Sequence, residues 1–403
     1  MSENKIKLVR KFIYNLYFMK KTLLFVLCIV STALCINLNA ETLEEKVARL
    51  ESKLASLEAK TEATDSVIIA EVIEPKKKMQ PISVKFDARF DWQSSFTHHS
   101  DAKPSYASNF NGRYLMFMLD GNISPKFSYS LRYRMIHPDQ NGASWYDVYK
   151  ATDWANLTYR PTKNWEITAG KMLVFYGSYE FDYNPLDVYM WSGWGGRVGC
   201  FQFGVMGKYI TDDRRNNILF QINNSPFADP LSLGAMYSYS VQWNGNFGIF
   251  NALYSDNLIE YQPGRFINYI SLGNQFNFGP VKFELDYMNR YGGRGTHFLK
   301  DFSLIGKINY NCMNRLNIFV KGGLDYNMAQ EEGEADVIDM LILPGERNVY
   351  YGAGLEFFPI KDSKNVRIHA FWQSGSNNLD GQSWNNHNVG IGFKWRLVAF
   401  ERK

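Results

Sequence analysis

The sequence lacks the long apolar runs that a bundle of membrane-spanning helices needs. Its 403 residues are 45% hydrophobic, yet the longest apolar stretch, Leu23 to Ile36, is shorter than the roughly 20 residues that span a bilayer as a helix. This stretch follows Lys20 and Lys21 near the N-terminus, an arrangement typical of a secretory signal peptide. The composition therefore excludes a helical membrane protein and favours export.

We interpret residues 1–40 as a signal peptide whose true start is Met19. Cleavage after Ala40 is the preferred site, and cleavage after Ala33 is the alternative. Neither cysteine of this segment has the leucine three residues before it that a lipoprotein signal requires. We therefore expect export through a cleaved signal without lipidation.

Excess positive charge is also missing from the mature chain. The full sequence has a formal net charge of +4, but residues 1–40 hold six Lys or Arg residues against Glu3, a net +5. Removing this segment turns +4 into −1. The charge therefore indicates no nucleic-acid partner.

Cysteines and catalytic motifs are scarce. Only Cys200 and Cys312 follow the signal peptide, and they fall at opposite ends of predicted strands, so we expect no disulfide. The sequence contains no HExxH, GxSxG or paired CxxC motif. We predict no catalytic residues, no metal site and no cofactor. A lipid-modifying enzyme stays as an alternative, with His98 and His99 as its candidate residues.

What the sequence has in abundance is alternation. In the run from Ile82 to Phe96, apolar side chains occupy one parity and charged or polar side chains the other. Side chains on a strand point alternately to its two faces, so this run predicts a strand with one apolar and one polar face. The pattern recurs in runs of about ten residues, the length of a tilted strand that crosses a bilayer.

Sixteen such strands can be placed between residues 82 and 403. Their connections alternate between short turns and longer loops, and both termini fall on the short-turn side. The longer connections are expected at about 98–109, 137–152, 176–196, 223–231, 256–264, 292–299, 327–346 and 375–387. This asymmetry is typical of outer-membrane barrels. The predicted fold is all-β: a 16-stranded antiparallel transmembrane β-barrel.

A short helix is predicted between the signal and the barrel. In residues 41–64 apolar residues are spaced alternately four and three apart, which is the seam of a coiled coil, at Leu43, Val47, Leu50, Leu54 and Leu57. We interpret this segment as an oligomerisation helix, the alternative being a single surface helix. Residues 65–81 form a linker.

The polar face of the strands must line the inside of the barrel, and basic residues outnumber acidic ones on it. Such a lumen favours anions, because Lys and Arg replace part of an anion's hydration. The alternative is that many of these charges pair with acids on neighbouring strands. The predicted pore-lining basic residues are Lys85, Arg89, Arg132, Arg134, Lys208, Arg290, Lys307, Lys321, Arg367 and Lys394.

The connection at residues 176–196 is rich in aromatic and acidic residues and contains no basic one. A loop this apolar is unsuited to free solvent, so we expect it to fold inward and narrow the pore. The alternative is that it packs on other loops at the barrel mouth. The predicted constriction residues are Tyr176, Tyr179, Glu180, Phe181, Asp182, Tyr183, Asp187, Tyr189, Trp191 and Trp194.

One passage, WANLTYRPTKNWEITAGK at residues 154–171 followed by MLVFYGSYEFDYN, resembles the phosphate-selective porin O and P family. The resemblance implies a homotrimeric channel in the outer membrane of a Gram-negative bacterium, embedded among lipid and lipopolysaccharide. It also implies an arginine-rich lumen and passive diffusion of small polar or anionic solutes.

The sequence departs from the family pattern in two respects: its constriction loop has no lysine, and Phe175 stands where the family has proline. Phosphate specificity therefore stays open. The alternative to a channel is a non-conducting barrel with a structural or adhesive role.

Overall fold

The computed structural model describes residues 81–136, 145–197, 199–228, 236–292, 299–328, 342–379 and 381–402. All of them belong to one compact unit, Gln80–Lys403. The predicted signal peptide, the coiled coil and the linker up to residue 80 lie outside the described residues and stay predictions.

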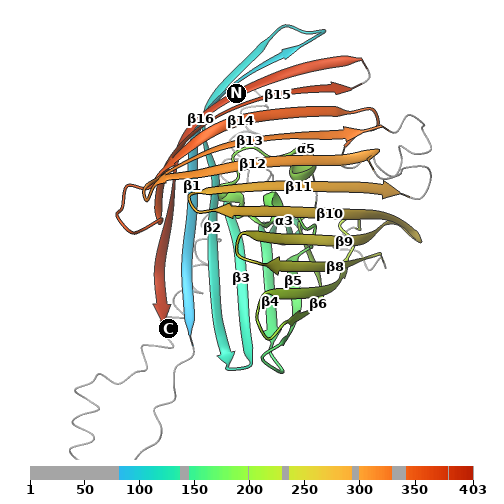
Figure 1. The fold of residues 1–403 in the computed structure, drawn as a ribbon, viewed down its shortest axis with the longest axis vertical. Helices are drawn as coiled ribbons and strands as arrows, with labels where there is room; N and C mark the ends of the chain where they lie inside the picture. The colour runs from blue at the N-terminus through green and yellow to red at the C-terminus, as the bar shows by residue number, and fades with distance from the viewer. Residues whose placement is uncertain are drawn as a thin grey trace, which may run out of the picture. The chain divides into compact units, whose positions relative to one another are not determined.

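The described unit is a closed barrel of sixteen strands in which each strand pairs with its neighbours in the sequence and β1 pairs with β16 (Figure 1). All sixteen pairings are antiparallel. The predicted fold class is therefore confirmed. The strands are β1 (Ile82–His99), β2 (Ser105–Ser124), β3 (Phe127–Ile136), β4 (Thr152–Tyr159), β5 (Trp165–Leu173), β6 (Phe201–Ile210), β7 (Asn216–Asn224), β8 (Tyr237–Asn246), β9 (Phe250–Gln262), β10 (Arg265–Phe278), β11 (Val281–Gly292), β12 (Asp301–Met313), β13 (Leu316–Asn327), β14 (Arg347–Phe357), β15 (Val366–Leu379) and β16 (Gln382–Arg402).

Within the described residues, four short helical segments interrupt the connections. They are α3 (Trp145–Ala151), α4 (Tyr179–Asp182), the 3-10 helix η1 (Pro185–Asp187) and α5 (Gly193–Arg197). Across the described ranges, no helix combines the length and the apolar character that a membrane crossing requires.

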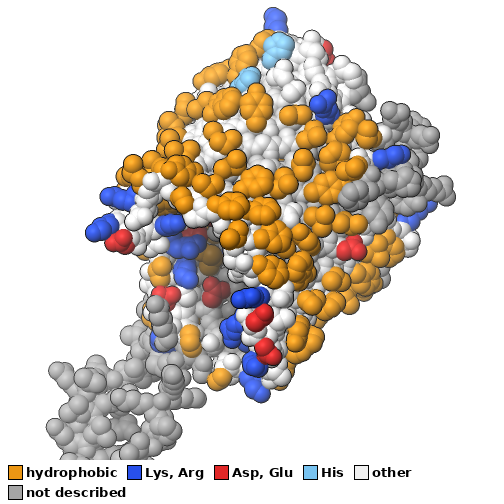
Figure 2. Space-filling model, in the orientation of Figure 1, with side chains coloured by type: hydrophobic (Ala, Val, Ile, Leu, Met, Phe, Trp, Pro, Cys, Tyr) orange, Lys and Arg blue, Asp and Glu red, His pale blue; other side chains and the backbone are white. Residues whose placement is uncertain are grey.

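The two faces of the wall differ in chemistry as the alternation predicts. Outward side chains such as Val205, Ile222 and Ile391 are 54%, 54% and 52% exposed. Polar side chains of the opposite parity, including Asp286 and Arg290, are buried inside the barrel. Figure 2 shows hydrophobic side chains spread over the outer wall and charged side chains gathered around a hollow at one end. An apolar outer belt with a polar interior suits a wall that contacts lipid.

Backbone hydrogen bonds connect the short turns to one another at one end of the barrel. Arg160 N donates to Lys126 O at 2.8 Å, and Asn311 N donates to Pro280 O at 2.8 Å. Each bond joins the end of one hairpin to the turn of the preceding one, so neighbouring turns along this rim are hydrogen-bonded to each other.

The other end departs from the expected loop lengths. The connections predicted at about 98–109, 256–264 and 375–387 are mostly strand, since β1, β2, β9, β10, β15 and β16 continue through them. The β9–β10 connection is a two-residue turn whose Gly264 has a φ of +73°, in the left-handed region that glycine adopts most readily. The first and last of these stretches are mostly polar on both faces, so their side-chain pattern resembles a loop although the backbone pairs as a sheet.

The lipid-facing assignment can be tested at Ile222. Replacing Ile222 by Arg should lower the free energy of unfolding from lipid vesicles by about 2–4 kcal/mol, because a charge near the bilayer centre must be desolvated. Ile222→Leu is the control and should change it by less than about 1.5 kcal/mol. Equal effects of the two substitutions, measured by denaturant titration, would contradict the assigned outer face.

Candidate functional site

The connection between β5 and β6 folds into the barrel. We call its residues 174–197 the lumen loop; they carry α4, η1 and α5. Asp187 accepts hydrogen bonds from Arg367 on β15 at 2.5 Å and from Lys394 on β16 at 2.7 Å. On the other side of the loop, Gly193 N donates to Asp325 on β13 at 2.8 Å. Contacts to strands from β9 round to β16 and β1 are compatible only with a position inside the lumen.

Local sequence explains the shape of this loop. Ser178 caps α4, its Oγ accepting from Phe181 N at 3.2 Å, and Asn184 caps η1 in the same way before Pro185. Gly177 has a φ of +67°, and a Cβ there would lie 2.4 Å from Ser255 Oγ. Only glycine therefore suits the point at which the chain turns inward.

An aromatic cluster holds the loop against the wall. Tyr176 and Trp194 are 1% and 0% exposed, and their ring centroids lie 5.8 Å apart in an edge-to-face arrangement. Phe181 packs against both rings, and Tyr269 of β10 packs against Tyr176. Edge-to-face pairs add roughly 0.5–1.5 kcal/mol each beyond burial. The aromatic content of the loop thus serves its attachment more than the pore surface.

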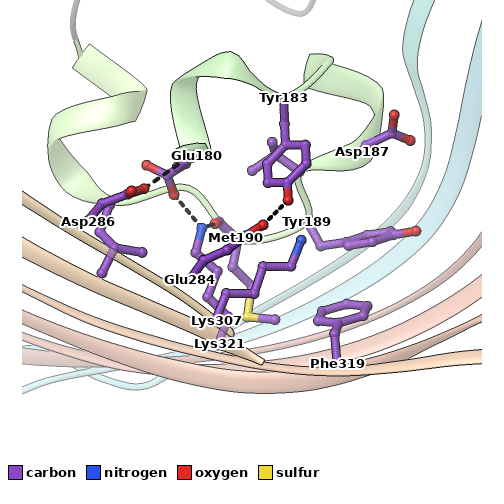
Figure 3. A pocket seen from close by; sticks show the side chains of 12 residues that line it. Glu180, Tyr183, Asp187, Tyr189, Met190, Glu284, Asp286, Lys307, Phe319 and Lys321 are labelled. Carbon is purple, nitrogen blue, oxygen red and sulfur yellow. Dashed lines mark hydrogen bonds and ion pairs between the residues drawn. The ribbon is translucent and has the colours of Figure 1, made fainter. Parts of the chain in front are cut away.

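Buried charges complete the attachment (Figure 3). Glu180 is 4% exposed and forms an ion pair with Lys321 of β13. Its carboxylate also accepts from Ser192 N at 3.0 Å, while its backbone N–H donates to Asp286 of β11 at 3.1 Å. Each buried charge has partners, as burial away from water requires.

Half of the loop residues predicted to form a constriction are therefore anchors. Those that are buried are Tyr176, Glu180, Phe181, Tyr189 and Trp194. Those that keep accessible surface are Tyr179, Asp182, Tyr183, Asp187 and Trp191. The second group is only partly packed, and within it Asp187 also anchors the loop through Arg367 and Lys394.

The predicted basic residues lie on the inner face, and most have a carboxylate partner. Arg290 pairs with Asp301 at 2.7 Å with both side chains 0% exposed, so it is sealed within the wall. The other pairs are Arg89 with Asp91, Arg132 and Arg134 with Asp153, Lys208 with Glu166, Lys321 with Glu180, and Arg367 and Lys394 with Asp187. The expected surplus of free positive charge is thus much reduced by acids on adjacent strands and on the loop.

Lys307 differs from this set. Among the described residues it has no ion pair; its Nζ lies 4.6 Å from the ring centroid of Tyr183 and 5.7 Å from that of Phe319. Lys85 likewise has no ion pair within the described part of the chain and is half-buried. Glu284 stands opposite Lys307 across β11 and β12, but no carboxylate of the described residues comes within ion-pair distance of either lysine.

Asp153 and Arg113 line the lumen but were not predicted from the sequence, and both lie at β-bulges. The pairing of β3 with β4 shifts where Arg132 opposes Trp154 and Tyr133 opposes Thr152, which leaves Asp153 unopposed and turned inward. The pairing of β1 with β2 shifts where Arg89 opposes Tyr114 and Phe90 opposes Gly112, which leaves Arg113 unopposed. A bulge interrupts strict alternation, so parity assigns such residues to no face.

The loop leaves space on the side of β2 to β6. A cavity of about 750 Å³ lies there, bounded by the wall on one side and by Asp182, Tyr183 and Trp191 of the loop on the other. Its wall residues are Arg113, Tyr114, Met118, Arg132, Arg134, Trp154, Leu173, Cys200 and Phe201. A second cavity of about 390 Å³, toward the short turns, is lined by Lys282, Lys307, Lys364, Arg367, Lys394 and Arg396 together with acids and amides.

Comparison with known families agrees with this geometry. Residues 84–248, which include the first eight strands and the lumen loop, match the family model for phosphate-selective porin O and P. The match covers 165 of the 403 residues, so over this part the chain is similar to that family. No curated protein matches the sequence. A porin family match on a closed barrel supports an outer-membrane channel.

Solved porins share the fold at low sequence identity. The outer-membrane channel DcaP of Acinetobacter baumannii is 12% identical with a TM-score of 0.56, covering 80% of this chain and 98% of that one. An anion-selective porin from Comamonas acidovorans is 12% identical with a TM-score of 0.55, covering 78% and 100%. OmpT of Vibrio cholerae, described as a trimer form, is 12% identical with a TM-score of 0.50, covering 78% and 99%.

The attachment of the lumen loop can be tested at Trp194. Replacing Trp194 by Ala should raise single-channel conductance and current noise, because truncating a buried aromatic costs about 3–5 kcal/mol and loosens the loop. Trp191→Ala is the control: it removes a half-buried ring that lines the large cavity without touching the cluster. Unchanged noise in Trp194→Ala would show that the loop is held independently of this cluster.

The Asp187 anchor makes a pH-dependent prediction. Burial tends to raise the pKa of Asp187, but the charges of Lys394 and Arg367 outweigh it and hold the pKa below its usual value. A carboxyl group whose pKa is lowered by folding stabilises the folded loop when the pH is above the ordinary pKa. This stabilisation is lost as the pH drops through the lowered pKa. The noise of the single-channel current should therefore stay constant from pH 7 to about pH 4 and rise below pH 4.

Asp187→Asn should show high noise across this whole pH range, since it lacks the charge that both cations bind. Asp182→Asn, on an exposed loop carboxyl without an ion pair among the described residues, is the matched control. If Asp187→Asn behaved like the native protein at pH 7, the anchor would not depend on charge.

Proposed function

We propose that this protein is a passive diffusion porin for small polar solutes with a preference for anions. The observation that carries the proposal is the lining of the two larger cavities. The larger has three arginines, Arg113, Arg132 and Arg134, against one carboxylate, Asp182. The cavity toward the short turns has six basic residues against Asp187 and Glu356.

The positions of the neutralising acids support anion preference. Asp153 lies behind Arg132 and Arg134 at 0% exposure, whereas the two arginine side chains are 6% and 11% exposed. Arg132 also stacks on Trp154, with its Cζ 3.7 Å from the ring centroid. A solute in the cavity therefore meets the cations before the carboxylate, and positive side chains that line a narrow pore attract anions and repel cations.

The ten basic residues predicted to line the pore differ in whether they border a cavity or are buried. Arg132, Arg134, Lys307, Arg367 and Lys394 border the two cavities. Arg89, Arg290 and Lys321 are almost fully buried and contribute to the field from behind the lining. Phosphate is one anion among several that such a lining accepts; it is not singled out, because the loop carries no lysine.

We also propose that the channel assembles as a homotrimer. The related fold of OmpT has been described as a trimer form, and the heptad pattern in residues 41–64 provides a further association element. Native mass determination of the protein in detergent, with and without residues 41–64, tests this assembly. A monomeric mass for the full mature chain would contradict it.

Planar-bilayer recording tests the channel itself. The refolded protein should give discrete conductance steps, and a salt gradient should give a reversal potential of the sign expected for anion flow. Phosphate and succinate should reduce the current in proportion to their occupancy. Folded protein that leaves the bilayer silent would favour a structural or adhesive barrel.

Lys307 offers a sharp test of the anion preference. Lys307→Gln should lower the anion-to-cation permeability ratio by up to about fivefold, because removing a unit charge at contact distance is worth roughly 1 kcal/mol in water. Lys163→Gln makes the same charge change on an exposed turn, where Lys163 is 77% exposed, and should leave the ratio near the native value. Equal ratios in both variants would remove Lys307 from the selectivity path.

A further inference from the structure

Arg113 lies where the regular ladder between β1 and β2 breaks. Arg89 opposes Tyr114 and Phe90 opposes Gly112, so Arg113 is the extra residue of a bulge. Its side chain lines both the large cavity beside the lumen loop and a separate cavity of about 260 Å³. Bulges often re-aim a side chain beside a functional site. Here the bulge directs a guanidinium to the boundary between two cavities.

The charge of Arg113 is poorly cancelled. Its Nη2 donates to the amide oxygen of Gln93 at 3.2 Å, and its Nε has no hydrogen-bond partner among the described residues. The nearest carboxylate oxygen, Oδ2 of Asp91, is 3.9 Å from that Nε. Asp91 is already bound by Arg89 at 2.7 Å and by His369 at 2.8 Å. Arg113 therefore keeps most of its charge for a ligand, and its side chain is 33% exposed.

The smaller cavity beside Arg113 is lined by amides. It lies between the tall strands β1, β2, β15 and β16 and contains no carboxylate. Gln373 and Asn388 oppose each other across β15 and β16, and neither side chain hydrogen-bonds any described residue. The polar lining residues apart from Arg113 are Gln93, Ser95, Asn109, Gln373, Asn386 and Asn388, and Tyr189 and Phe371 border the cavity.

Amides restrict the ligand in a way that cations alone do not. Each amide presents an acceptor oxygen beside a donor nitrogen, so a matching ligand must both donate and accept. A hydroxyl group does both, whereas a fully ionised inorganic anion only accepts. Because Arg113 is the single cation of this cavity, a matching ligand carries one negative group. A guanidinium binds a carboxylate with two parallel hydrogen bonds. The volume approaches the roughly 300 Å³ at which small-molecule sites begin.

We propose that Arg113 and the amides around it form a binding subsite for a hydroxylated monocarboxylate of monosaccharide size, that is, a sugar acid. The carboxylate binds the Arg113 guanidinium, and the hydroxyls bind Gln373, Asn388 and the neighbouring amides. This subsite rests on the proposed channel function, since it holds the solute immediately before the arginine-lined cavity. It makes the porin selective among anions by their hydroxyl groups.

Inhibition of ion current through the full-length protein in a planar bilayer tests this subsite. Glucuronate should half-block the current at a concentration about tenfold lower than acetate, which lacks the hydroxyls, and than glucose, which lacks the charge. Arg113→Gln should raise the half-blocking concentration of glucuronate about tenfold and leave that of glucose unchanged.

The two unpartnered amides provide variants that should not disturb folding. Gln373→Ala and Asn388→Ala should each raise the half-blocking concentration of glucuronate by about threefold to tenfold while acetate is unaffected. Asn385→Ala is the matched control, since Asn385 lies on β16 on the opposite, exposed face. It should leave all three solutes unchanged.

The outcomes separate this inference from the proposed function. Anion-directed reversal with equal block by glucuronate and acetate would overturn the sugar-acid subsite and leave the anion channel intact. Equal block by glucose and glucuronate would overturn the role of Arg113. Cation-directed reversal in the native protein would overturn the channel proposal itself, whichever solute blocks.

Discussion

Each strand of this barrel forms its backbone hydrogen bonds with its two neighbouring strands, because lipid hydrocarbon provides no hydrogen-bond partners. The ladder between β1 and β16, which runs from Ile82 opposite Arg402 to His99 opposite Trp384, meets that constraint by closing the sheet. Closure then divides the side chains into two sets. Those facing lipid must be apolar, so nearly all charge in the wall faces inward. The polar lumen is therefore a consequence of backbone pairing and not a separate feature of the sequence.

Charge directed inward must still be compensated, and this requirement positions the lumen loop. The wall between β13 and β16 provides Lys321, Arg367 and Lys394, and the loop provides Glu180 and Asp187. Residues 176–196 of this loop hold acids and no bases, so their carboxylates pair with the basic part of the wall. Its aromatic residues then pack on the adjacent strands. The larger cavity lies on the opposite side, along β2 to β6, and the arginines of β2 and β3 line it.

Much of this was predictable from sequence because it depends on periodicity. A two-residue period determines which face a side chain occupies, so the sixteen strands and the inward direction of residues such as Arg132 and Lys307 followed from parity. The partners of the charged residues could not be predicted from parity, since Asp187 pairs with Arg367 and Lys394, which lie about 200 positions away in the sequence. The length of the strands could not be predicted from parity either. The outer ends of β1, β2, β15 and β16 are polar on both faces, so they lack the alternation that identifies a strand.

The least predictable positions are also those that shape the lumen most. In a regular ladder each residue has one direct neighbour across the strand, which fixes its environment and, for a charge, supplies a partner of matching register. A bulged residue has no such neighbour, so its surroundings can be richer or poorer than the ladder allows. Asp153 reaches two arginines at 2.6 Å and cancels one of their two positive charges. Arg113 reaches no carboxylate closer than 3.9 Å and stays available. Selectivity in such a barrel can therefore change through the position of a bulge while composition and strand number stay the same.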